Sequence, residues 1–293
     1  MASSIRASTT NSAVPSVRPR ARRLRRMLSR PRAAVGIGLS TLLVGLALLA
    51  PIVAPHDPLA QARGDELASP SLRFPFGTDE LGRDILSRVL FGARISLMVA
   101  LLSVLIASVV GVLIGLVGGY FGGRWDAVIM RLTDTILAFP AILLAMAIVS
   151  LLGPSSLSAM LAVAIVSIPT YARLSRSSVL AEREREYVEA SRAMGAADRR
   201  IIFRTILPNT LTPVVIQITI SMGYAVLLEA GLSFLGLGTQ PPAPSWGAML
   251  FSSSSYLHQA PWYGLYPGVF LTVLILGLNF ISEGVQEVYS PRA

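Results

Sequence analysis

The sequence predicts an all-α integral membrane protein with six transmembrane helices. Of its 293 residues, 53% are hydrophobic and only 14% are charged, and the mean hydropathy is +0.63. Soluble domains carry about 25% charged residues. Several apolar runs approach or exceed the ~20 residues that cross a bilayer as a helix. This pattern differs from the ~10-residue segments of alternating hydrophobicity that a transmembrane β-barrel would show.

Residues 1–32 are rich in Ser, Pro and Arg, and we interpret them as a disordered cytoplasmic tail. They hold nine of the 25 basic residues of the chain, all of which are Arg, and no acidic residue. A basic tail can bind nucleic acid or anionic lipid, but no aromatic residue is interleaved with these arginines to stack on bases. Directly before an apolar helix, the arginines indicate orientation, because positive residues stay in the cytoplasm.

The first predicted transmembrane helix covers 33–54, which contains no charged residue. A secretory signal peptide is the alternative interpretation, but its apolar region would span only ~7–15 residues, so a retained helix is favoured. A polar segment with four Arg and six acidic residues follows at 55–93. We therefore assign 33–91 to a first transmembrane helix and an extracytoplasmic segment.

Five further helices are predicted in a core at 92–286, which leaves 287–293 as a cytoplasmic C-terminus. The predicted spans are 95–119, 128–152, 157–171, 211–235 and 265–281. A long charged segment, 172–210, separates the fourth helix from the fifth. A loop at 236–264 without Arg, Asp or Glu precedes the sixth helix.

The distribution of Arg predicts the orientation of these helices. Six spans place both termini on the same side of the membrane, together with 172–210. The two long segments on the other side, 55–93 and 236–264, together hold only four Arg. The positive-inside rule therefore predicts a multi-pass protein of the cytoplasmic membrane with both termini in the cytoplasm.

The second predicted helix contains Gly111 and Gly115, followed by Gly118 and Gly119. Glycines spaced four residues apart allow two membrane helices to approach closely. Two interpretations are open, packing against another helix of this chain and contact with a second subunit, and the sequence favours the internal contact.

The charged segment 172–210 contains the most unusual pattern of the chain. Residues 186–209 indicate two short helices: the first ends at Gly195, which can adopt positive φ, and Asp198 can cap the second. Pro208 predicts a boundary before the fifth transmembrane helix. A solvated loop is the plain alternative, but two short helices bury little surface by themselves and so indicate a binding partner.

This segment resembles the EAA loop of permease subunits in bacterial ATP-binding-cassette (ABC) importers. The family pattern is Glu-Ala-Ala, three residues, Gly, nine residues, Ile, any residue and Leu-Pro. Ser191 stands for the second Ala, and Thr205 stands where Ile is usual. The resemblance implies a coupling helix that sits in a groove of the ATPase subunit. The residues that we assign to this coupling loop are Glu186, Tyr187, Glu189, Ala190, Ser191, Met194, Gly195, Asp198, Leu207 and Pro208.

Three other stretches of sequence narrow the resemblance to one subfamily of permease subunits. Residues 77–88 read Gly-Thr-Asp-Glu-Leu-Gly-Arg-Asp-Ile-Leu-Ser-Arg, residues 134–140 read Asp-Thr-Ile-Leu-Ala-Phe-Pro, and residues 232–247 join Leu-Ser-Phe-Leu-Gly-Leu-Gly to a Pro-rich run. Together they resemble the C-type permease subunit of oligopeptide, dipeptide and nickel ABC importers. The resemblance covers the chain from about residue 33 onward.

The resemblance implies the type I ABC importer permease fold and transport by alternating access. The implied partners are a second homologous permease subunit, two cytoplasmic ATP-binding subunits or domains, and an extracytoplasmic substrate-binding protein. Membrane lipid surrounds the helices, and no nucleic acid is expected. The implied substrate is a short peptide, with nickel or another small solute as the alternative.

No pattern in the sequence indicates an enzyme. A P-loop needs a Lys on the phosphates, and the chain has neither Lys nor Cys. No His-Glu-x-x-His metal motif occurs. We therefore expect no catalytic, cofactor-binding or metal-binding residues here, and we expect ATP and Mg²⁺ to be bound by the partner ATPase subunits.

Glu229 lies inside the fifth predicted transmembrane helix. A charge at this depth costs a few kcal/mol unless it faces protein or water. Two interpretations are open: a polar group that lines the outer end of the translocation path, or a structural hydrogen bond to Ser, Thr or a neighbouring subunit. An ion-coupled transporter, which often uses interior acids and broken helices, has this one Glu in its favour and does not require the loop at 172–210.

Overall fold

The computed structural model describes residues 29–289. Most of the predicted tail, 1–32, and part of the predicted C-terminal segment, 287–293, lie outside the described residues. Within 29–289 the protein is helical, and its only bridge of β type is an isolated antiparallel pair between Thr78 and Asp84.

The helices follow one another with short connections, apart from a loop between α10 and α11 and a long segment between α3 and α4, which is named the outer segment after its predicted side of the membrane. The elements are α2 (Pro31–Leu48), α3 (Ala50–Val53), α4 (Ile85–Phe121), α5 (Gly123–Leu137), α6 (Ala141–Leu152), α7 (Ser156–Arg183), α8 (Glu186–Ala193), α9 (Asp198–Arg200), the π-helix η1 (Ile201–Ile206), α10 (Leu207–Phe234), α11 (Trp246–Ser253), the 3₁₀-helix η2 (Ser254–Tyr256) and α12 (Pro261–Tyr289). Five helices are long and apolar enough to cross a membrane, and the bent pair α5–α6 makes up to six. The prediction of six spans therefore holds if this pair counts as one.

The third span is broken, although a single helix was predicted at 128–152. The helix α5 stops at Leu137 and α6 starts at Ala141, with a bend of 93° between them. Pro140 explains the break, because proline has no N–H for the helical hydrogen bond and its ring clashes with the carbonyl four residues earlier. The prediction of a continuous third helix is wrong for this reason.

Several helices are longer than predicted, and in α4 and α7 the additional turns hold charged residues that are paired. The helix α7 continues to Arg183 instead of stopping at residue 171. In this added part of α7, Arg176 forms an ion pair with Asp126 of α5, with Nη2 to Oδ2 at 2.6 Å. The helix α4 starts at Ile85, ten residues earlier than predicted, and Asp84 caps it by accepting from the backbone N–H of Ser87 at 2.9 Å.

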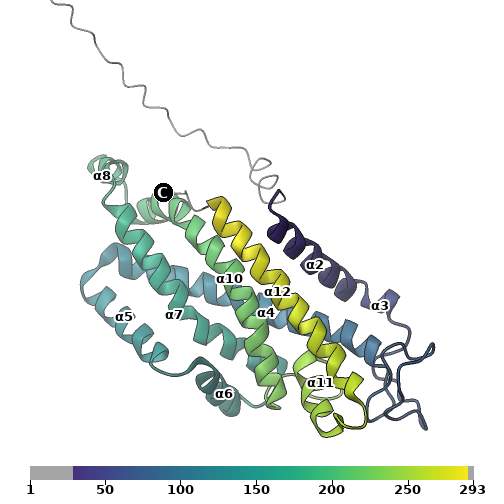
Figure 1. Cartoon of the computed structure of the whole chain (residues 1–293). Helices are drawn as coiled ribbons and strands as arrows, with labels where there is room; N and C mark the ends of the chain where they lie inside the picture. Colours follow the sequence, from purple (N-terminus) through teal and green to yellow (C-terminus); the bar gives the residue numbers. More distant parts are fainter. Residues whose placement is uncertain (1–28, 290–293) are drawn as a thin grey trace, which may run out of the picture.

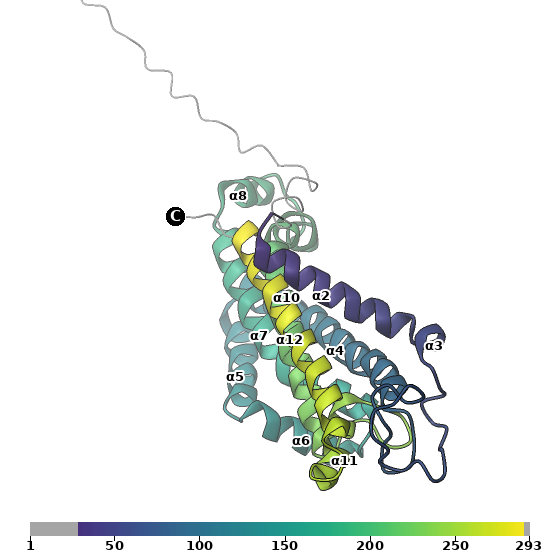
Figure 2. The same ribbon diagram turned by 45° about the vertical axis from the view of Figure 1, so that its right-hand side comes forward.

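The spanning helices form one bundle with two different ends (Figure 1, Figure 2). The described start of α2, the end of α12 and the helix α8 lie at one end of the bundle, and α11 and the segment between α3 and α4 lie at the other. This arrangement agrees with the predicted grouping of 55–93 with 236–264, and of 172–210 with both ends of the chain.

The helices α4 and α7 pack closely through glycines. A Cβ atom on Gly111 would lie 2.5 Å from Cβ of Tyr171, and one on Gly115 would overlap the backbone oxygen of Ala172. The hydroxyl of Ser175 donates to the carbonyl oxygen of Val112 at 3.0 Å in the same contact. The interpretation of Gly111 and Gly115 as internal packing is therefore confirmed.

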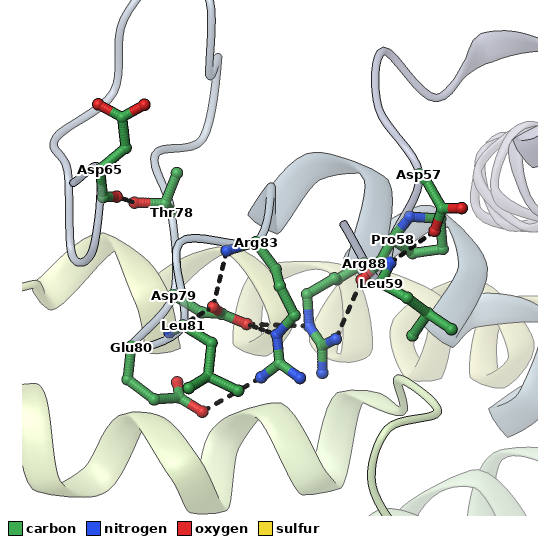
Figure 3. A network of polar contacts seen from close by, with 10 residues as sticks. All are labelled: Asp57, Pro58, Leu59, Asp65, Thr78, Asp79, Glu80, Leu81, Arg83 and Arg88. Carbon is green, nitrogen blue, oxygen red and sulfur yellow. Dashed lines mark hydrogen bonds and ion pairs between the residues drawn. The ribbon is translucent and has the colours of Figure 1, made fainter. Parts of the chain in front are cut away.

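The outer segment is anchored to α4 by a buried network of charges (Figure 3). Asp79 is fully buried, and its Oδ2 accepts from Nε of Arg83 at 2.6 Å and lies 3.2 Å from Nε of Arg88. Nη1 of Arg88 also donates to the carbonyl oxygen of Pro58 at 3.1 Å. Buried charges require such partners, so this motif ties the loop to the first turns of α4.

Candidate coupling surface and membrane-depth polar residues

The helix α8 projects from the end of the bundle beyond α7 (Figure 1). Its first turn carries the carboxylates of Glu186 and Glu189, and its last turn carries Arg192. This placement suits the helix dipole, which favours negative charge at the N-terminus and positive charge at the C-terminus. Val188 is fully buried and anchors α8 on the rest of the loop.

Gly195 ends the first short helix, as predicted. Its φ is +78°, and the backbone N–H groups of Gly195 and Ala196 donate to the carbonyls of Arg192 and Ser191 at 2.9 and 3.1 Å. This pair of bonds is a Schellman motif, which needs a residue with positive φ just beyond the helix. No atom lies within 4 Å of a Cβ built on Gly195, so the requirement for glycine here is conformational and not steric.

Asp198 does not cap the second helix, and that prediction is wrong. The N-cap of α9 is Ala197, without a side-chain cap, and Asp198 is the first helical residue. The Asp198 carboxylate instead accepts from the hydroxyl of Tyr120 at 2.5 Å. Tyr120 lies in the last turn of α4, so this bond ties the coupling loop to the end of a spanning helix.

The second short helix is not a separate element. The α9 helix, η1 and α10 form one helix over Asp198–Phe234. Pro208 lies in the first turn of α10, where the π-helix changes to α-helix and Leu207 N–H donates to the carbonyl of Ile202, five residues earlier. Proline cannot donate in the α-helical pattern, and a wider π turn is one way to absorb such a defect. The predicted break at Pro208 is therefore a change of helix type.

Further hydrogen bonds hold α8 against α7 and α10. The hydroxyl of Tyr187 contacts the carboxylate of Glu182, and Nδ2 of Asn209 donates to the Tyr187 hydroxyl at 3.1 Å. Nη1 of Arg183 donates to the carbonyl oxygen of Gly119 at 3.0 Å, at the end of α4. Sequence reasoning missed Tyr120, Arg183 and Asn209, because their partners are between 22 and 78 residues away in the chain.

Most of the assigned coupling residues are on the surface. The half-buried members are Ser191 and Leu207, and the exposed members are Glu186, Tyr187, Glu189, Ala190, Met194, Gly195, Asp198 and Pro208. Met194 is 81% exposed at the tip of the loop. A flexible thioether on a surface of small residues and carboxylates suits a protein-binding contact, since Met adapts to irregular apolar pockets.

Glu229 is buried inside the bundle. Only 1% of it is exposed, and its Oε1 accepts from the hydroxyl of Ser233, one turn further along α10, at 2.8 Å. Of the two interpretations, this geometry matches the structural hydrogen bond. A role in lining the outer end of the translocation path stays a prediction, because the carboxylate is not at an open surface of this chain.

These features define a multi-pass inner-membrane protein with the type I ABC importer permease fold: apolar spans, a glycine-packed core, a broken third span and an exposed loop that carries α8 at one end. Residues 111–293 match the model of the family described as binding-protein-dependent transport system inner membrane component, and the chain belongs to this family. Residues 19–70 match the N-terminal transmembrane domain of oligopeptide transport permease C.

Curated relatives cover most of the chain. The di/tripeptide transport system permease protein DppC of Pseudomonas aeruginosa (strain UCBPP-PA14) is 45% identical over 88% of this chain and 87% of its own length. The dipeptide permease DppC of Alkalihalophilus pseudofirmus is 41% identical over 89% and 86%. The glutathione permease GsiD of Shigella flexneri serotype 5b is 44% identical over 86% and 83%.

A solved structure shares the fold. The MetNI methionine ABC transporter, in an inward-facing conformation, superposes with a TM-score of 0.57 over 71% of this chain and 98% of that chain, at 20% identity. Membership of a binding-protein-dependent transport family implies an ATPase and a substrate-binding protein as partners. The relatives are permease subunits, which are not themselves enzymes.

Proposed function

We propose that this chain is the permease subunit of an ATP-driven ABC importer that moves di- and oligopeptides across the cytoplasmic membrane. The names of the relatives, which specify dipeptide and di/tripeptide transport, support the substrate. The observation that carries the mechanism is the exposed surface of α8 and Met194, in register with the EAA pattern and held at one end of the bundle.

The same proposal orients the protein in the membrane. Residues 172–210 and both termini face the cytoplasm, and the segment between α3 and α4 faces outward together with α11. The eight Arg of residues 172–210 lie at the end of the bundle that carries α8, and they support this orientation because positive residues stay in the cytoplasm. The substrate-binding protein then delivers peptide to the outer end, and a second homologous permease subunit completes the path.

Coupling follows from the way the loop is built. Two ATPase subunits bind ATP and Mg²⁺ and close on each other, and one of them moves α8. The helix α8 packs against η1, and α9, η1 and α10 are one continuous helix. A displacement of α8 therefore moves α10 inside the membrane, which changes the side on which the path is open.

The proposal is tested by reconstituting the chain with a second permease subunit, ATPase subunits and a binding protein from the same organism, and by measuring uptake of a labelled peptide library and of Ni²⁺. We expect peptide uptake that needs internal ATP and external binding protein, and no ATPase activity in the chain purified alone. Uptake of Ni²⁺ without peptide would contradict the substrate, and uptake driven by an ion gradient without ATP would contradict the mechanism.

A further inference from the structure

The break in the third span opens a cavity halfway through the bundle. Its volume is about 320 Å³, and its walls are the α5–α6 junction and the middle of α7 and α10. The residues concerned are near 167 in α7 (Ser156–Arg183) and near 220 in α10 (Leu207–Phe234), which places the cavity at half the length of both helices. In many membrane transporters, sites beside broken helices at this depth hold substrate.

Part of the cavity lining is polar. The polar lining residues are Gln217, Ser221 and Tyr224 of α10 and Ser167 and Thr170 of α7. Tyr224 is 47% exposed, and Thr170 is also exposed. The rest of the lining is apolar and includes Phe139 next to the helix break.

Some of these polar groups lack a partner. Ser167 donates to the carbonyl of Val163 at 2.7 Å, and Nε2 of Gln217 donates to Ser221 at 3.2 Å. Within residues 29–289, neither the hydroxyl of Thr170 nor that of Tyr224 forms a hydrogen bond, although both are at membrane depth. Leaving hydroxyl and amide groups in hydrocarbon is costly, so this surface is suited to water or a polar ligand and not to lipid.

The side chains that line the cavity indicate which class of ligand it can bind. Its eleven residues include hydroxyl and amide groups but no charged side chain, imidazole or sulfur. Neutral groups that both donate and accept match the N–H and C=O of a peptide bond. They match a bare transition-metal ion poorly, because such ions prefer imidazole, thiolate or carboxylate ligands.

We propose that Gln217, Tyr224 and Thr170 hydrogen-bond the peptide bond of the passing substrate and so select for peptides regardless of side-chain charge. This proposal rests on the proposed function and adds to it the group that is recognised. Recognition of the backbone alone explains how one path can accept peptides with different side chains.

The test compares an amide with an ester in the complete reconstituted importer. The maximal initial uptake rate is measured with saturating binding protein for trialanine and for the analogue in which the N–H of the peptide bond between its first and second residues is replaced by an ester oxygen. The variants are Gln217→Leu and Tyr224→Phe. The matched control is Thr219→Val on the same helix, because Thr219 donates within α10 to the carbonyl of Ile216 at 2.7 Å and does not line the cavity.

Gln217→Leu should slow trialanine uptake about threefold to tenfold, the effect of one lost hydrogen bond, and should slow the ester much less. The ratio of amide to ester rates therefore falls in this variant, while discrimination by the binding protein cancels between variants. Uptake of Ala-Lys-Ala and Ala-Glu-Ala should fall by the same factor as that of trialanine. Thr219→Val should leave every rate unchanged.

An unchanged ratio of amide to ester rates in both cavity variants would overturn the inference while leaving peptide import intact. Tyr224→Phe keeps the ring and so carries the same comparison if Gln217→Leu fails to assemble. If the wild-type importer moves no peptide at all, the proposed function fails, and this inference fails with it.

Discussion

At the scale of single residues, the coupling loop depends on backbone conformation at one position. Gly195 has a φ of +78° in open space, and a β-branched residue strongly disfavours that conformation. Asn tolerates it better than most residues. Substitution of Gly195 by Val and by Asn therefore separates the effect of backbone strain from the effect of a changed side-chain contact.

Gly195→Val should weaken assembly with the ATPase subunits or uncouple ATP hydrolysis from uptake, because about 1–2 kcal/mol of strain opposes the Schellman turn. Gly195→Asn should retain most of the activity. Membrane insertion should be unchanged in both variants, since the apolar spans drive it. The measurement is co-purification of the ATPase subunits, followed by uptake in vesicles. Equal activity of Gly195→Val and wild type would refute the role of this turn.

A second residue-scale prediction concerns the outer charge network. Asp79 pairs with two buried arginines, whereas Asp65 pairs with Arg73 at 3.0 Å on the surface. Asp79→Ala should destabilise the protein by about 3–5 kcal/mol, because the buried Arg88 loses its carboxylate partner and the buried Arg83 keeps only Glu80. Asp65→Ala should cost less than about 1 kcal/mol.

Thermal unfolding of the two purified variants in the same detergent checks this difference. A similar midpoint for Asp79→Ala and Asp65→Ala would mean that the buried network does not stabilise the outer segment.

At the scale of elements, the contact between α4 and α7 depends on the absence of side chains. A Cβ on Gly115 would overlap the backbone oxygen of Ala172, whereas a Cβ on Gly118 would lie no closer than 3.4 Å to Asp126. Both glycines are buried in the same helix, so they form a matched pair.

Gly115→Ala should separate α4 from α7 and lower the yield of folded, monodisperse protein, with a loss of about 1–3 kcal/mol from overpacking. Gly118→Ala should have little effect or should stabilise the helix, because Ala has the better helix propensity. Fluorescence-detected size-exclusion chromatography after heating ranks the two variants. The packing account is wrong if Gly118→Ala proves the more damaging.

Local features of the chain made many of the elements predictable. Apolar runs predicted the existence of each span, and Gly195 was assigned correctly because a glycine after an amphipathic helix has a local signature. The ends of α4 and α7 were misplaced because the sequence does not show that Arg88 pairs with Asp79 of the preceding segment or that Arg176 pairs with Asp126 of another helix. The break at Pro140 had a visible cause, since a proline inside a helical pattern ends or kinks it.

The candidate sites were likewise predictable where a local sequence pattern marks them and unpredictable where they depend on contacts between helices. The exposed surface of α8 followed from a motif, whereas its attachment through Tyr120 to Asp198 depends on the packing of α4 beside the loop. The polar cavity also requires four helices, α5, α6, α7 and α10, to be placed together. The sequence shows Gln217 and Tyr224 only as isolated polar residues in an apolar span, so their common cavity was not predicted.

At the scale of the whole molecule, the two ends of the bundle differ in structure. One end carries α8 within the Arg-rich segment 172–210, and the other carries the outer segment and α11 (Figure 1). Between them, α10 passes from the coupling loop along the polar cavity to Glu229. In the mechanism that we propose, α10 therefore connects ATP-driven movement at one end with the substrate path in the middle.

The central claim is that α8 and Met194 dock on a cytoplasmic ATPase subunit. Because the chain has no cysteine, single cysteines can be placed at Met194 and, as a control, at the fully exposed Leu72 of the outer segment. The most direct measurement is site-specific cross-linking in membranes that contain the complete importer, combined with labelling of intact cells by an impermeant thiol reagent. We predict that Met194→Cys cross-links to the ATPase and resists external labelling, while Leu72→Cys does the reverse. External labelling of Met194→Cys, or no adduct with the ATPase from any position on α8, would contradict the account.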